Sequence, residues 1–186
     1  MSLDRNKKIV IAVTLGALAL LLVFSTVSNP SQTEDNRTSA EFNRADLMFM
    51  NMMIIHHDQA IEMAELAENR TDNENILELS ENISEAQTQE NKQMAEWLNQ
   101  LGYERPVRGH RMAGMASQSQ MEELRNSNST EFDRLFAGLM ITHHQGGIQM
   151  AQNFVDQGRN PELREMERGM IEAQQREIEL MRKWQQ

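Results

Sequence analysis

An internal repeat is the feature that most constrains the fold of this chain. A pair of histidines preceded by methionine occurs twice, as Met53-Ile-Ile-His56-His57 and, 87 residues later, as Met140-Ile-Thr-His143-His144. The same offset relates other identical residues with no insertion between them: Asp46 and Asp133, Phe49 and Phe136, Met63 and Met150, Gln87 and Gln174, Glu90 and Glu177, Met94 and Met181, Trp97 and Trp184. A fixed offset over about 50 positions indicates that one structural unit was duplicated.

Each copy of the repeat has the pattern of two helices joined by a tight turn. In the first copy, the capping boxes Thr38-x-x-Glu41 and Thr71-x-x-Glu74 predict helices over about residues 38–69 and 71–101, with Gly102 just past the second. No strand-like alternation of apolar and polar residues occurs, so both segments are read as helical.

The second copy and the link that precedes it carry similar signals. Residues 103–116 contain Pro106 and two glycines and are expected to form a loop, and Ser117-x-x-Gln120 predicts a short helix to Arg125. A long helix should run from about residue 128 to just before Gly158. Asn160-Pro161 then opens the last helix as its N-cap and its first helical residue.

These segments predict an all-α fold. One helical hairpin cannot bury its apolar stripe alone, so two hairpins are expected to pair into an antiparallel four-helix bundle. The bundle domain should span residues 39–186, with repeat 1 at about 42–101, a loop at 102–128 and repeat 2 at about 129–186.

The N-terminal region reads as a membrane anchor or signal segment over residues 1–28, followed by a polar linker over residues 29–38. Residues 9–27 contain no charge, about the length that a membrane-spanning helix needs. Arg5, Lys7 and Lys8 precede them and predict that the bundle lies outside the cytoplasm. Cleavage of the segment as a signal peptide is the alternative, and it exports the bundle as well.

Charge and cysteine usage narrow the function. The formal net charge is −10, which argues against nucleic acid as a partner. The chain has no cysteine, so neither a disulfide nor a thiolate ligand is available. Its 15 methionines and five histidines leave thioethers and imidazoles as the ligands for a soft metal.

The paired histidines and nearby methionines are therefore candidate copper ligands. On the predicted first helix, Met53 lies three and four residues before His56 and His57, so a thioether and an imidazole can meet one ion. Adjacent histidines point about 100° apart on a helix, so one of each pair could bind metal within a site while its neighbour lies at the flank or contributes to a second site. The full set of candidates is His56, His57, His143, His144, Met48, Met52, Met53, Met63, Met140 and Met150.

Carboxylates and amides on the helices could orient the imidazoles. A metal-binding histidine commonly donates its second ring N–H to such a group, which fixes the tautomer. The residues expected in this supporting role are Asp46, Asp133, Gln87, Glu90, Gln174 and Glu177. The same polar residues could equally lie on solvated helix faces.

A further candidate site lies in the predicted loop, where His110, Met112 and Met115 form a His-x-Met-x-x-Met motif. Alone this motif is weak. Methionine is also a routine core residue, and that is the expected role of Met94, Met166 and Met181.

The combination of motifs resembles the family catalogued as domain of unknown function 305. The resemblance covers about residues 42–184 and rests on Met53-x-x-His56-His57, Gln87-x-x-Glu90, Met112-x-Gly-Met115, Met140-x-x-His143-His144-x-Gly146 and Gln174-x-x-Glu177. It implies a ferritin-like helical bundle. Some characterised relatives are periplasmic copper-binding proteins linked to copper resistance, so it also implies a protein that binds or buffers copper outside the cytoplasm.

The sequence supports three hypotheses about function. The leading hypothesis is a membrane-tethered, non-enzymatic protein that sequesters Cu(I) or Cu(II), or passes copper to a donor or acceptor protein. A di-iron or di-manganese oxidase is the enzymatic alternative, but its usual Glu-x-x-His pairs do not occur in the sequence. A metal-free interaction module in the cell envelope is the third. Methionine-lined helix faces could also support a homodimer.

Overall fold

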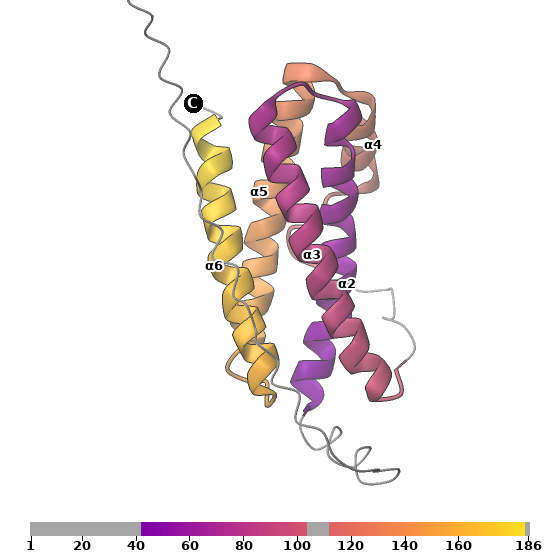
Figure 1. The fold of residues 1–186 in the computed structure, drawn as a ribbon, viewed down its shortest axis with the longest axis vertical. Coiled ribbons are helices and arrows are strands. Elements are labelled where there is room, and N and C mark those ends of the chain that lie inside the picture. The colour runs from indigo at the N-terminus through magenta and orange to yellow at the C-terminus, as the bar shows by residue number, and fades with distance from the viewer. Residues whose placement is uncertain (1–41, 104–111, 185–186) are drawn as a thin grey trace, which may run out of the picture. The chain divides into compact units, whose positions relative to one another are not determined.

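The computed structural model describes residues 42–103 and 112–184. Within these ranges the chain is all-helical, with five α-helices, one 3-10 turn and no strand (Figure 1). The elements are α2 (Arg44–Glu65), η1 (Ala67–Asn69), α3 (Glu74–Gln100), α4 (Gln118–Asn126), α5 (Ser129–Phe154) and α6 (Pro161–Trp184). The predicted anchor over residues 1–28 and linker over residues 29–38 lie outside the described residues.

The helices form the two hairpins that the repeat predicts. Helix α2 packs along α3, and α5 packs along α6, each pair joined by a short turn (Figure 1). The hairpins meet mainly through α2 and α5. The Phe49 ring of α2 lies 6.1 Å from the Phe154 ring of α5, so the start of α2 faces the end of α5 and the two helices are antiparallel.

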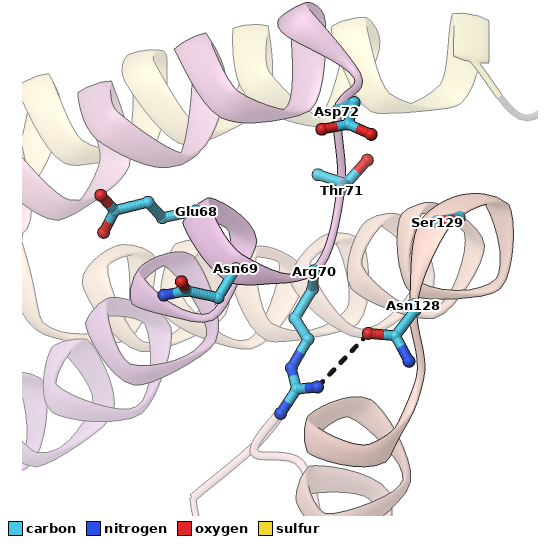
Figure 2. Close-up of a pocket in the computed structure, with 7 residues that line it drawn as sticks. All are labelled: Glu68, Asn69, Arg70, Thr71, Asp72, Asn128 and Ser129. Atoms are coloured by element: carbon cyan, nitrogen blue, oxygen red, sulfur yellow. Dashed lines mark hydrogen bonds between the residues drawn. The ribbon is translucent and has the colours of Figure 1, made fainter.

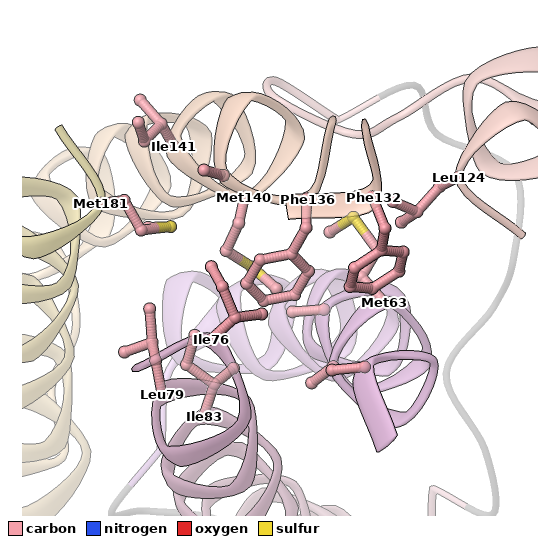
Figure 3. Close-up of a cluster of buried hydrophobic side chains, with 14 of the residues drawn as sticks. Met63, Ile76, Leu79, Ile83, Leu124, Phe132, Phe136, Met140, Ile141 and Met181 are labelled. Atoms are coloured by element: carbon pink, nitrogen blue, oxygen red, sulfur yellow. The ribbon is translucent and has the colours of Figure 1, made fainter. Parts of the chain in front are cut away.

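Two apolar cores lie at opposite ends of the α2–α5 contact. The Phe49 core includes Met53 of α2 and Met150 of α5. The Phe136 core, drawn in Figure 3, includes Met63 of α2 and Met140 of α5. Met53 and Met140 are equivalent in the repeat, as are Met63 and Met150, and each pair is divided between the two cores. Because α2 and α5 are antiparallel, each core is built from different parts of the two repeats.

Two predicted helix starts are wrong. Helix α2 begins at Arg44 rather than near Thr38, because Asn43 and Asp46 form a complete capping box; Thr38 itself lies outside the described residues. Helix α3 begins at Glu74 with Asn73 as its N-cap. Thr71 instead accepts a hydrogen bond from the Asn73 backbone. In both turns an asparagine nearer to the helix caps the free N–H groups.

Helix α2 also ends at Glu65, earlier than the predicted end near residue 69, whereas the other helix starts agree with the sequence. Ser117 and Gln120 form the predicted capping box of α4. Asn160 caps α6, with its side chain accepting from the Leu163 backbone at 2.8 Å. Gly102 follows α3 with a positive φ of 79°, which only glycine adopts without strain.

No helix within residues 42–103 and 112–184 is both long enough and apolar enough to cross a membrane.

Candidate metal centre

A layer of four buried histidines separates the two apolar cores. We call His56 and His57 of α2 and His143 and His144 of α5 the histidine layer. All four side chains are fully excluded from solvent. Along α2 the layer lies between Met53 of the Phe49 core and the residues that enter the Phe136 core, so it crosses the middle of the helix pair.

His56 and His143 face each other across the contact between α2 and α5. Their ring centroids are 3.7 Å apart with an interplanar angle of 32°. This distance places the two imidazoles in direct face contact. Because the residues are equivalent in the repeat, the pair lies where the two hairpins meet.

His57 and His144 face the second helix of their own hairpin. The Nε2 atom of His57 lies 2.8 Å from Oε2 of Glu90 on α3, and Nε2 of His144 lies 2.6 Å from Oε2 of Glu177 on α6. The predicted placement of both glutamates beside imidazoles therefore matches the geometry.

Both histidines of each pair are buried, so neither lies at the flank of the core. The main packing partners of α2 and α5 are each other and the second helix of the same hairpin. A separation of about 100° between adjacent residues lets one imidazole face each partner, so both are buried.

A loop segment closes over the layer at His56. The Nε2–H of His56 donates to the carbonyl oxygen of Ala113 at 3.1 Å. One helical turn further along α2, the Gln59 side chain donates to the carbonyl of Ala116 at 3.0 Å and accepts from its N–H at 2.7 Å. These bonds hold residues 112–116 against α2.

The same segment packs directly on α5 because both surfaces lack side chains there. A Cβ atom added to Gly146 would lie 2.0 Å from the Ala113 oxygen, and one added to Gly114 would lie 2.5 Å from the Thr142 oxygen. Gly114 also has a positive φ of 81°. Glycine at these two positions is what lets the Ala113 carbonyl reach His56.

The hydrogen bonds define which ring nitrogens carry lone pairs. A ring that donates from Nε2 to a carbonyl or carboxylate has, when neutral, an unprotonated Nδ1. This holds for His56, His57 and His144, and their Nδ1 atoms are buried without a hydrogen-bond partner among the described residues. Neither ring nitrogen of His143 has a partner there. The layer thus holds an unusual number of free imidazole lone pairs.

Burial keeps the central imidazoles neutral. It lowers the pKa of His56 to about 3, with nearby His57 adding to the effect. It also lowers the pKa of His143 well below its usual value, with His56 as the next cause. A neutral imidazole is the form that binds metal ions.

Two glutamines of the outer helices are buried, and Gln174 approaches the layer beside His56. Gln87 of α3 and Gln174 of α6 are buried, and the Oε1 atom of each lacks a hydrogen-bond partner within the described ranges. A Cβ atom added to Gly147 would lie 2.7 Å from Oε1 of Gln174 and 3.3 Å from Cε1 of His56. The absence of a side chain at Gly147 therefore makes room for both groups.

The candidate methionines lie in different environments. Met53, Met112 and Met150 are buried in the Phe49 core, with Met52 and Met115 packed against its edge. Met63 and Met140 belong to the Phe136 core, and Met48 is 45% exposed. His110 lies outside the described residues.

Asp46 and Asp133 have partners other than imidazoles, which corrects their expected role. Asp46 accepts from the backbone N–H groups of Asn43, Arg159 and Asn160, and so fixes the turn between α5 and α6. Asp133 accepts from the Asn73 side chain at 2.8 Å, in the turn before α3. Each carboxylate belongs to one hairpin and holds the turn of the other.

The layer is not a preformed site of the common carboxylate and imidazole type. Within residues 42–103 and 112–184, no three His, Cys, Asp or Glu side chains are arranged to hold one ion. Thioethers would have to complete any site here.

Sequence reasoning missed the loop contacts of Gln59, Ala113 and Gly146, and the burial of Glu167. Gly114 and Gly146 were the available signals, because glycine often marks a close backbone approach. The Ala113 carbonyl has no side-chain signature.

A polar pocket of about 260 Å³ lies away from the layer, at the turn between α2 and α3 (Figure 2). In this pocket Arg70 donates from Nη1 to the Asn128 side chain at 3.3 Å. None of the predicted ligands lines it; the lining residues are Glu68, Asn69, Arg70, Thr71, Asp72, Asn128 and Ser129.

The chain is similar to one known protein family. The family model described as domain of unknown function (DUF305) matches residues 46–185. No curated protein matches the chain.

Several solved structures are similar. A candidate secreted DUF305 protein from Streptomyces coelicolor is 31% identical, with a TM-score of 0.69 over 74% of this chain and 89% of that one. A DUF305 fragment from Deinococcus radiodurans is 28% identical, with a TM-score of 0.69 over 75% and 94%. CopM in the Cu(I)-bound form is 33% identical, with a TM-score of 0.64 over 75% and 94%. CopM has also been solved in Cu(II)-bound and silver-bound forms.

Proposed function

The chain belongs to the DUF305 family, and from this premise we propose that it binds copper through the histidine layer without catalysing a reaction. The observation that carries the proposal is the set of buried Nδ1 atoms without hydrogen-bond partners in His56, His57, His143 and His144. Free lone pairs on buried neutral imidazoles are costly unless a ligand uses them.

The surrounding side chains favour copper over harder cations. Thioethers suit Cu(I), and imidazole accepts both Cu(I) and Cu(II). The buried methionines on either side of the layer, Met53 and Met140, are each three residues before a histidine of the same helix, within reach of a shared ion. CopM, which is 33% identical, has been crystallised with Cu(I), with Cu(II) and with silver, and this supports the same choice.

Glu90 and Glu177 would support the ligands without touching the ion. Each accepts the Nε2–H of a histidine, so Nδ1 carries the lone pair. A carboxylate in this position also raises the basicity of the imidazole. The other candidate ligands would guide copper toward the layer or complete its coordination. They are Met52, Met48, Met63, Met150, Met112, Met115 and His110.

The wider setting of the protein belongs to the same proposal. The two hairpins would close into an antiparallel four-helix bundle anchored by residues 9–27 on the outer side of the cytoplasmic membrane. Copper held there would be sequestered or handed to a partner protein, contributing to copper tolerance. The likeness to a candidate secreted protein and to CopM supports this location.

Competition for Cu(I) tests the function. The full-length chain would be titrated against a colorimetric Cu(I) chelator, alongside the double variant His56→Phe, His143→Phe, which keeps two stacked rings but removes their nitrogens. We expect the protein to compete with the chelator and the variant to bind at least about tenfold more weakly.

The matched control is Ser80→Ala, which removes a buried polar group of α3 outside the layer. Its affinity should equal that of the unmodified chain. Absence of competition by the unmodified chain, or equal affinity of the double variant, would overturn the proposal.

A further inference from the structure

Glu167 of α6 is a buried acid that the histidine layer does not use. Its side chain is fully excluded from solvent, and neither carboxylate oxygen has a hydrogen-bond partner among the described residues. An ionised carboxylate in this setting is strongly disfavoured unless a proton or a cation neutralises it.

The nearby cationic side chains are engaged elsewhere. Arg164 donates from Nε to the Val155 carbonyl at 2.8 Å. Arg168 pairs with Glu165 at 3.5 Å on the exposed side of α6. The carboxyl of Glu167 therefore forms no ion pair with either guanidinium.

Two carboxylates and two guanidiniums act on Glu167 in opposite directions. Burial first, and then the charge of Asp46, raise the pKa of Glu167 to about 7, with Asp156 acting in the same direction and Arg164 and Arg168 opposing it. Asp46 is itself fixed by backbone N–H groups. When Glu167 is ionised, its buried carboxylate therefore has no hydrogen-bond partner to compensate the charge.

Thioethers surround this part of the fold. Met170 lies three residues after Glu167, on the same face of α6, and is buried in the Phe49 core together with Leu163. Met50 lies one turn after Asp46 on α2 and is fully buried in that core. The buried methionines of the Phe49 core are Met50, Met53, Met94, Met112, Met150 and Met170.

The duplication shows that the fold does not require an acid here. The residue equivalent to Glu167 in the first repeat is Ser80, which is also buried. A serine therefore satisfies the same position between the helices of a hairpin. Along α6, Glu167 lies between Leu163 and Met170 of the Phe49 core, whereas along α3 Ser80 lies between Leu79 and Ile83 of the Phe136 core.

We propose that the carboxylate of Glu167 and the thioethers of Met170 and Met50 form a second site, for a soft monovalent cation such as Ag(I) or Cu(I). Neutral thioethers bind soft cations but leave their charge uncompensated, and the single carboxylate supplies the compensation. When the acid is protonated, the O–H bond breaks, the oxygen binds the cation and the proton leaves to solvent. This site shares with the proposed function only the nature of the ion.

Silver binding tests the second site, since Ag(I) does not change oxidation state in the assay. Calorimetric titration of the full-length chain with silver nitrate, in chloride-free buffer near pH 6, would be compared with Glu167→Gln and Met170→Leu. We expect Glu167→Gln to bind one equivalent fewer and to release about one proton fewer. Met170→Leu should weaken the same equivalent at least about tenfold.

Two matched controls locate the effect. Glu165→Gln changes an exposed acid of the same helix, and Met181→Leu changes a buried methionine of the Phe136 core. Both should keep the equivalent that Glu167→Gln loses. Glu167→Gln keeps the shape of the side chain and removes only its ionisable group, so its circular dichroism should match that of the unmodified chain.

The outcomes separate this site from the histidine layer. Loss of one silver equivalent in Glu167→Gln, with that equivalent retained in His56→Phe, His143→Phe, supports a second site. Equal stoichiometry, affinity and proton release in Glu167→Gln and the unmodified chain would overturn it. Loss of copper binding in the histidine variant alone would then leave the proposed function standing.

Discussion

At the scale of single residues, the group that accepts the hydrogen bond from Nε2 of each imidazole determines which ring nitrogen can bind a metal ion. His57 and His144 are held by Glu90 and Glu177, whereas His56 is held by a backbone carbonyl. A carboxylate fixes the tautomer more firmly than a carbonyl does, because its hydrogen bond is charge-assisted. The outer histidines should therefore depend on their glutamates for metal affinity.

Replacing one of these glutamates tests that dependence. Glu177→Gln can still accept from His144, but without the negative charge that raises the basicity of the ring. We expect Cu(I) affinity, measured by chelator competition, to fall by about 10- to 100-fold. The exposed neighbour Glu179→Gln is the control and should not change the affinity.

A second prediction at this scale concerns pH. Burial raises the pKa of Glu167 from its ordinary value of 4.5 to about 7, so the folded state favours the protonated acid. The associated stability is complete below about pH 4.5 and is lost as pH rises through about 7. In urea denaturation, Glu167→Gln should not lose this stability between pH 5 and pH 8. Over this range its free energy of unfolding should therefore rise by roughly 1 to 3 kcal/mol relative to that of the unmodified chain. Parallel pH profiles for the two proteins would contradict the prediction.

At the scale of elements, residues 112–116 are fixed against α2 and α5, although only Met112 is buried. This segment bonds to α2 through Gln59 and meets α5 without intervening side chains at Gly146. Its position therefore depends on the absence of one Cβ atom. Backbone contact of this kind cannot be relieved by rotating a side chain.

Gly146→Ala should break the contact. The new Cβ atom would lie 2.0 Å from the Ala113 oxygen, so the segment must move and the hydrogen bond from His56 must lengthen. We expect a loss of roughly 1 to 3 kcal/mol in the free energy of unfolding, measured with urea. In Gly169→Ala, at an exposed position of α6, the new Cβ atom has no neighbour within 4 Å. The free energy of unfolding of this variant should instead rise by up to about 1 kcal/mol.

The helix faces were predictable from the sequence, and the turns and loop were not. The buried residues Phe49, Met53, His56, Ala60 and Met63 of α2 follow three-four spacing, because burial on a helix follows its period. The capping box at Thr71 was overridden by Asn73, two residues closer to the helix. The Ala113 contact depends on tertiary packing of backbone, which leaves no periodic pattern in the sequence.

At the scale of the whole molecule, the hairpins hold each other through their turns. Asp46 of the first hairpin accepts from Arg159 and Asn160 in the second, and Asp133 of the second accepts from Asn73 in the first. These bonds lie at opposite ends of the α2–α5 contact. They therefore resist separation of the hairpins at both ends.

The two carboxylates should differ in their effect on stability. Asp46→Ala leaves three backbone N–H groups, one of them buried, without this acceptor and should cost on the order of 3 kcal/mol. Asp133→Ala removes one side-chain hydrogen bond and should cost about 1 kcal/mol. Thermal unfolding of both variants measures the difference; a larger effect of Asp133→Ala would contradict this account.

The two aspartates that each accept hydrogen bonds from the turn of the opposite hairpin also bear on the origin of the chain. Each hairpin supplies what the turn of the other requires, and equivalent histidines of the two copies stack on one another. An ancestor only one hairpin long would have met these needs by pairing with a second copy of itself about a two-fold axis. Duplication within one gene then joined the two partners, so that assembly no longer depended on protein concentration. It also freed the copies to diverge, as the serine and the glutamate at positions 80 and 167 have done.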